Sequence, residues 1–188
     1  MQRNRWLTRV MLIALVDAWL AACSDNKTST PTTPTPTPAP PTVAQLAGVW
    51  TMTETRTALS GGECLEGTLN STIGSVTPLT MSFNQNGSSL NASGTVQTTG
   101  ISCSWTGTAD VGRFALNMTS CQAAVNQIGI RCSNGAVRDL RIASSGLNAA
   151  STSTGYAGTK SDTYNVVVSG TSQVVGTLTI NSSIAMTK

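Results

Sequence analysis

The chain has 188 residues, a formal charge of +3, only 10% charged residues and no histidine. Without histidine it lacks the usual general base, the Ser-His-Asp and Cys-His nucleophile systems and the commonest zinc ligand. Residues 1–22 carry Arg3, Arg5, Arg9 and Asp17, so 8 basic and 7 acidic residues remain beyond them. That balance gives no clustered basic face for nucleic acid, and we expect no nucleic-acid partner, cofactor or metal.

Residues 1–22 have the anatomy of a secretory signal peptide. Three arginines precede the apolar run Val10–Val16, and small residues follow at Ala21 and Ala22. A basic start, a short apolar run and a small-residue end are typical of such signals. A membrane-spanning helix is the alternative, but residues 10–22 are fewer than the roughly 20 apolar residues a span needs, and Asp17 interrupts them.

The segment Leu20-Ala21-Ala22-Cys23 resembles the lipobox of bacterial lipoproteins. This resemblance implies cleavage by signal peptidase II and a Cys23 that carries diacylglycerol. Two or more acyl chains anchor a protein stably, whereas one binds only marginally. Ser24 follows the cysteine instead of the aspartate that retains such proteins at the inner membrane. The resemblance therefore implies a lipid-anchored protein of the bacterial envelope, at the outer membrane.

Residues 23–42 form a tether after this cysteine. The stretch Thr28–Thr42 contains six of the seven prolines. Proline at this density fixes φ and removes hydrogen-bond donors, so we expect an extended spacer with no core of its own. At about 3.1 Å per residue, fifteen such residues reach roughly 45 Å.

From residue 43 to residue 188 apolar residues alternate with Ser, Thr and Asn. Leu79, Met81 and Phe83 share one face of such a segment, and later segments repeat the pattern. A period of two is typical of half-buried antiparallel strands, and no segment keeps helical spacing over ten residues. The pattern predicts an all-β domain: a single antiparallel up-and-down barrel of about eight to nine strands, with a β-sandwich as the alternative.

The connections between these strands differ in length. Turn-forming residues predict short turns at 85–88, 109–112, 144–146 and 169–172. Longer connections are expected at 57–77, 121–135 and 155–162. In a meander, successive connections fall at opposite ends, so we expect tight turns at one end of the barrel and long loops at the other.

Four cysteines lie in the domain: Cys64, Cys103, Cys121 and Cys132. An even number in an exported chain predicts two disulfides, and three pairings are possible. All four fall at the expected long-loop end. We favour Cys121–Cys132 and Cys64–Cys103, because Cys103 shares the inward phase of Trp105 whereas Cys121 is out of phase with Met118. Each bond would contribute about 3 kcal/mol.

The first strand of the domain resembles the Gly-x-Trp signature of lipocalins and related barrels, at Leu46-Ala47-Gly48-Val49-Trp50-Thr51. The resemblance implies that Trp50 closes the base of a barrel and that the long first loop lies at its mouth. A core aromatic in any β-domain is the other interpretation of Trp50. The Thr-Asp-Tyr motif of that family is missing at the corresponding turn.

A barrel of about eight strands is just wide enough to fill itself or to hold one small ligand. We predict a non-catalytic binding module for a small apolar ligand that contacts Trp50, Phe83, Trp105 and Phe114. One alternative is an interaction domain, adhesin-like or inhibitory, whose long loops contact an envelope or surface macromolecule. Another is a carboxylate enzyme, which needs two carboxyl groups about 5–10 Å apart, taken from Glu54, Glu63, Glu66, Asp110, Asp139 and Asp162.

Overall fold

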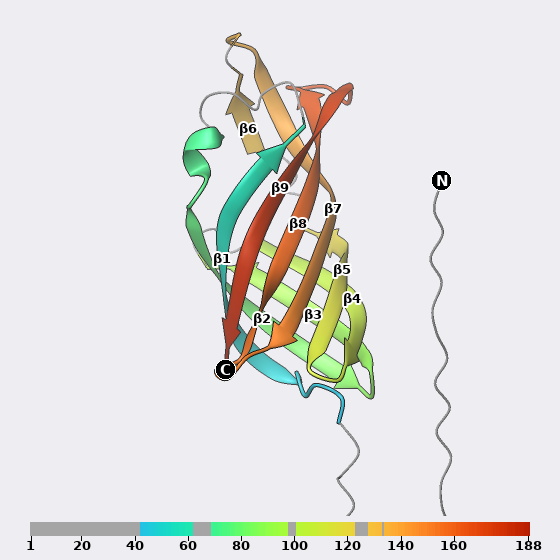
Figure 1. Ribbon diagram of the computed structural model, residues 1–188. Coiled ribbons are helices and arrows are strands. Elements are labelled where there is room, and N and C mark those ends of the chain that lie inside the picture. The colour runs from blue at the N-terminus through green and yellow to red at the C-terminus, as the bar shows by residue number, and fades with distance from the viewer. Residues whose placement is uncertain (1–41, 62–68, 98–100, 123–127, 133) are drawn as a thin grey trace, which may run out of the picture. The chain divides into compact units, whose positions relative to one another are not determined.

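Eight antiparallel strands of the domain close into a single barrel in the computed structural model (Figure 1). The structure describes residues 42–61, 69–97, 101–122, 128–132 and 134–188, all within one compact unit, Pro40–Lys188. The predicted signal peptide, Cys23, most of the tether and Cys64 lie outside the described residues. The strands are β1 (Gly48–Ser60), β2 (Val76–Asn86), β3 (Ser89–Val96), β4 (Ile101–Asp110), β5 (Arg113–Cys121), β6 (Ile128–Arg131), β7 (Val137–Ser151), β8 (Tyr156–Val168) and β9 (Val174–Thr187), with a short 3₁₀ turn, η1, at Asn70–Thr72.

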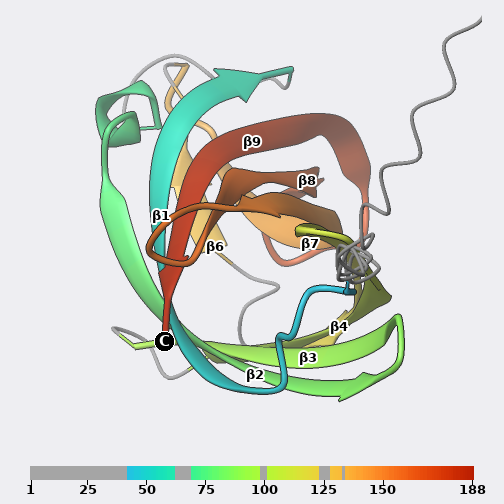
Figure 2. The ribbon, with the colours of Figure 1, turned by 60° about the horizontal axis from the view of Figure 1, so that its bottom comes forward.

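The strand order confirms the predicted up-and-down barrel. Neighbours run β5-β4-β3-β2-β1-β9-β8-β7-β6, and an additional β5–β7 pairing closes the ring. Among the described residues the short strand β6 pairs with β7 alone, so it extends that wall without entering the ring. Because the ring has an even number of strands, its first and last strands along the chain, β1 and β9, pair antiparallel. Figure 2 shows these strands curving around a common axis.

The turns that were predicted at 85–88 and 109–112 are confirmed as tight hairpins. In each, a glycine with positive φ, Gly87 or Gly112, takes the left-handed conformation that such turns require. The third tight turn at this end lies at 152–155. This end of the barrel, the lower one in Figure 1, is called the floor.

Two predicted connections are wrong. No turn occurs at 144–146, because β7 runs unbroken through it, and residues 156–162 are strand and not loop. The register of β7 against β8 shifts between Ile142 and Ser144, which makes Ala143 a bulge residue. A bulge adds one residue and reverses the alternation, so one long strand looked like two. The 169–173 turn consequently lies at the end opposite the floor, with the loops around η1 and β6.

The N-terminal segment of the domain seals the floor. Gln85 Nε2 donates to the carbonyl of Ala44 at 2.7 Å, and its Oε1 accepts from the Leu46 amide at 2.7 Å. Leu46 is fully buried, and its carbonyl accepts the indole N–H of Trp50 at 2.7 Å. Figure 2 shows this segment crossing below the strands.

Two clusters of buried apolar side chains fill the barrel. The larger lies at the floor, and the smaller lies toward the loop end, along β6 to β9, where it includes Leu140, Val166 and Leu178. Glycines allow the walls to approach closely near the floor: a Cβ on Gly107 would overlap the Ala115 carbonyl of β5. The larger cluster therefore packs the barrel interior closely at the floor.

Candidate ligand-binding site

A cavity of about 310 Å³ lies inside the barrel above the floor cluster. This volume is at the lower end of the range for small-molecule sites, roughly 300–1,000 Å³. Its wall combines apolar side chains with a group of charged and hydroxyl-bearing ones. The residues that line it are Glu54, Arg56, Thr77, Leu79, Gly94, Val96, Ile101, Cys103, Trp105, Ile142, Ser145, Lys160, Asp162, Tyr164 and Ile180.

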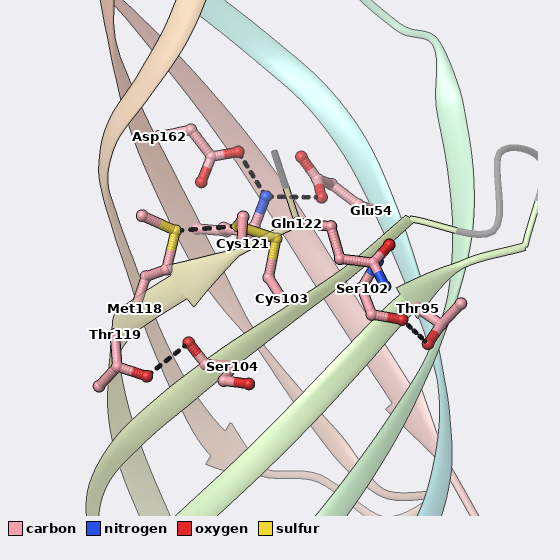
Figure 3. The surroundings of a disulfide bond; sticks show 11 residues. Glu54, Thr95, Ser102, Cys103, Ser104, Met118, Thr119, Cys121, Gln122 and Asp162 are labelled. Carbon is pink, nitrogen blue, oxygen red and sulfur yellow. Dashed lines mark hydrogen bonds and ion pairs between the residues drawn. A yellow bond between two sulfur atoms is a disulfide. The ribbon is translucent and has the colours of Figure 1, made fainter. Parts of the chain in front are cut away.

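A buried ion cluster forms one side of this cavity. Lys160 Nζ donates to Asp162 Oδ2 and to Glu54 Oε2, the latter at 3.0 Å. Lys160 and Asp162 are two residues apart on β8, so both face inward, whereas Glu54 comes from β1. Strand β9 lies between them, and its Ser182 donates to Glu54 Oε1 at 2.8 Å. Figure 3 shows the carboxylates of Glu54 and Asp162 on either side of the amine nitrogen.

Two groups of this cluster have shifted pKa values. Burial alone would lower the pKa of Lys160, but the carboxylates of Asp162 and Glu54 outweigh burial and raise that pKa above its ordinary value of 10.5. The pKa of Tyr164 is also raised above its ordinary 10.0, chiefly by burial and further by the negative charge of Asp162. Lys160 is therefore a cation and Tyr164 a neutral phenol throughout the physiological pH range.

Three polar atoms of the cavity lining are buried without a hydrogen-bond partner among the described residues. They are Trp105 Nε1, Ser145 Oγ and Asp162 Oδ1. Their residues are 4%, 3% and 4% exposed. Ser145 and Asp162 are directly opposite each other in the β7–β8 ladder. Buried polar groups are nearly always hydrogen-bonded, and leaving one unpaired costs about 1–3 kcal/mol.

A disulfide between Cys103 and Cys121 borders the cavity (Figure 3). This pairing contradicts the predicted Cys121–Cys132 and Cys64–Cys103 bonds. The register of β4 against β5 shifts between Ser104 and Trp105, so that Cys103 faces Cys121 directly. Met118 and Cys121 are an odd number of residues apart, which argues against this pair in a regular strand. The register shift adds one residue between them and so places Cys121 opposite Cys103. Cys132 is also disulfide-bonded.

Only one of the four predicted ligand-contacting aromatics, Trp105, lines the cavity. Trp50, Phe83 and Phe114 belong to the floor cluster. Trp50 and Phe114 each pack edge-to-face against Tyr156, and Phe83 packs edge-to-face against Phe114. The ring centroids are 5.5 Å apart for Trp50–Tyr156, 5.3 Å for Phe114–Tyr156 and 5.7 Å for Phe83–Phe114. These three aromatics therefore stabilise the closed end, and the prediction that they contact a ligand in this cavity is not supported by their position.

The structure brings together two of the candidate carboxylates, Glu54 and Asp162, with Lys160 between them. Asp110 instead pairs with Arg113 at the surface, and Asp139 accepts a hydrogen bond from Ser169 at 2.6 Å. Glu63 and Glu66 lie outside the described residues. Sequence reasoning missed Lys160, because residues 155–162 were interpreted as a loop.

Strands β5 and β7 are paired in the barrel wall below the cavity and are unpaired beside it among the described residues. Strands β5 and β7 pair only from Arg113 opposite Ala150 to Asn117 opposite Gly146. Beyond that point β5 continues to Cys121 paired with β4, and β7 is paired with β6 over Val137–Leu140. Among the described residues, the two strands therefore separate at the level of Ser145.

Among the described residues no helix is long and apolar enough to cross a membrane. No protein-family model matches the chain, and no match was found among curated proteins or solved structures.

Proposed function

We propose that this chain is an envelope lipoprotein, anchored through Cys23, whose barrel is a non-catalytic binding module for a small molecule with an apolar body. The observation that carries the binding role is the cavity itself. It is bounded below by a solid floor, and three buried polar atoms of its lining have no partner among the described residues. A ligand that combines an apolar body with a few polar atoms would satisfy both parts of that lining.

The anchor is tested by metabolic labelling with a radioactive fatty acid. We expect the full-length protein to be labelled and the Cys23→Ala variant to be unlabelled. An unlabelled wild-type protein would refute the lipid anchor. This result is independent of the binding role, because the cavity lies in the barrel and the anchor would lie at the far end of the tether.

The binding role is tested by equilibrium dialysis with tyrosol, a neutral phenol with a hydroxyethyl arm. The full-length protein is held in phosphatidylcholine nanodiscs, and empty nanodiscs correct for partition into lipid. We expect saturable binding that is lost in Val96→Trp, because this side chain lines the cavity and tryptophan would fill it. Asn91→Trp places the same bulk on an exposed position of the same strand and should bind as wild type. Equal binding by the two variants would refute the site.

A second candidate, contact with another macromolecule through the loop end, is favoured by exposed apolar side chains there. Ile73, Val76, Val137, Val174 and Val175 are each 38–60% exposed and border the connections at that end. We would compare capture from envelope fractions by wild type and by Val174→Ser/Val175→Ser. A partner captured only by wild type would support this role, and identical capture profiles would refute it.

A further inference from the structure

We propose that the cavity receives the ammonium group of a small amine, held between Asp162 and Ser145 against the indole of Trp105. This inference rests on the proposed binding function and adds the chemical class of the ligand. It starts from the hydrogen-bond arrangement of the ion cluster, in which every carboxylate oxygen except one has a donor.

Three of the four carboxylate oxygens are satisfied by the protein. Ser182 donates to Glu54 Oε1, and Lys160 donates to Glu54 Oε2 and to Asp162 Oδ2. The fourth, Asp162 Oδ1, is buried with no partner among the described residues. A charged oxygen in this position calls for a donor, and a charged donor gives the stronger bond.

The charges of the cluster favour a cation. Glu54 and Asp162 carry two negative charges, and Lys160 carries one positive charge, so the three together have a net charge of −1. Arg56 also lines the cavity, so the charged side chains of the whole lining sum to zero, but its Nη1 donates to Thr72 of η1, toward the loop end. A bound ammonium would pair locally with the free carboxylate oxygen of Asp162.

Geometry favours an ammonium over a single hydroxyl as the donor. Ser145 and Asp162 are directly opposite each other on neighbouring inward positions, so one group can reach both side chains. An ammonium has three N–H donors and can donate to Asp162 Oδ1 and to Ser145 Oγ together. The face of a tryptophan ring also attracts cations, whereas the free indole N–H would donate to an oxygen atom elsewhere on the ligand.

An anionic ligand fits this lining poorly. Lys160 already donates to both carboxylates, and it is only 8% exposed. A ligand carboxylate would therefore meet two like charges whose lysine is engaged, and Arg56, the other cation of the lining, already donates to Thr72. The expected ligand is an amine with an apolar or aromatic body and one oxygen acceptor.

The test compares three probes that share a phenol ring and differ in their second polar group: tyramine, tyrosol and 3-(4-hydroxyphenyl)propanoate. Each is dialysed against the full-length protein in phosphatidylcholine nanodiscs. We expect tyramine to bind at least tenfold more tightly than tyrosol, and the acid more weakly than both. If tyramine and tyrosol bind equally, the ammonium assignment is wrong and the binding function stands. If none of the three binds, both proposals are overturned.

Variants test whether the preference for tyramine over tyrosol depends on the named side chains. Asp162→Asn should abolish the tenfold preference for tyramine while tyrosol still binds, which also shows that the barrel is folded. Ser145→Ala leaves the ion cluster intact and should weaken tyramine several-fold. Asp110→Asn removes an exposed carboxylate that pairs with Arg113 and should change nothing. A preference that persists unchanged in both Asp162→Asn and Ser145→Ala would overturn the assignment.

The same ammonium could come from a soluble amine or from the headgroup of an ethanolamine lipid. Nanodiscs in which phosphatidylethanolamine replaces part of the phosphatidylcholine separate these sources. Weaker tyramine binding in those nanodiscs would identify the lipid headgroup as a competitor, and equal binding would identify a soluble amine. Both outcomes retain the ammonium chemistry.

Discussion

Replacing Lys160 with methionine should destabilise the barrel more than any change to a surface charge. Methionine has a similar length and no charge, so the substitution leaves the carboxylates of Glu54 and Asp162 facing each other without their shared cation. The three side chains are only 9%, 15% and 5% exposed, so water screens them poorly. Removing one partner from a buried ion pair typically costs about 3–5 kcal/mol.

That cost is a large fraction of the total free energy of unfolding of the domain. A domain of this size is typically stable by about 5–15 kcal/mol. We therefore expect Lys160→Met to lower the free energy of unfolding by about 3–5 kcal/mol. The measurement is urea unfolding at pH 7 with the disulfides intact, followed by far-UV circular dichroism.

Two further variants make this prediction specific. Arg113→Met removes a cation from an ion pair whose side chains are 72% and 65% exposed, so water screens the pair and we expect little change in the free energy of unfolding. Removing all charges with Lys160→Met, Glu54→Gln and Asp162→Asn should recover at least half of the lost stability, because no unpaired charge remains buried. A loss below 1 kcal/mol in Lys160→Met, or a triple variant no better than the single one, would refute a buried ion cluster.

Three other perturbations follow from the barrel walls and the cavity. Gly107→Ala should cost about 3 kcal/mol, since its Cβ would overlap the backbone of β5, whereas Gly129→Ala meets open space and should be neutral in the same urea assay. Replacing both Cys103 and Cys121 with alanine releases a link across 18 residues and should cost about 3 kcal/mol; an unchanged melting temperature would contradict the bond. Because the pKa of Tyr164 and that of Lys160 are raised in the fold, their contribution to stability is complete below pH 10 and is lost as pH rises beyond it. Urea unfolding at pH 8 to 11 should show that decline, and Tyr164→Phe should reduce it.

The fold could be predicted because one face of each strand is apolar. Leu79, Met81 and Phe83 are all buried, as their alternation indicated. The alternation fails where a bulge occurs, since an extra residue reverses which positions face inward. Ile142 and Leu147 belong to one strand, β7, but this reversal makes the segment resemble two strands separated by a turn. A sequence gives no clear sign of a bulge, because serine and glycine mark both bulges and turns.

The candidate site was only partly predictable, because it depends on register. Trp105 was predicted to contact a ligand, and it lines the cavity. The ion cluster joins β8 to β1 across β9, and its partners are 106 residues apart in the chain. Lys160 and Asp162 do share the inward phase of Tyr164, so a strand assignment for 156–168 would have placed two charges inside the barrel. The polar composition of residues 155–162 favoured a loop instead, so Lys160 and Asp162 were not predicted to lie inside the barrel.

The separation of β5 from β7 leaves part of the barrel wall without a continuous ladder. Backbone amides of Met118 to Cys121 on that side have no strand partner among the described residues. Such amides exchange with solvent through small local openings instead of global unfolding. The bond from Cys121 to Cys103 ties this loose border to the neighbouring strand. The covalent link thus holds the unpaired border of β5 to β4, and the gap between β5 and β7 stays unbridged among the described residues.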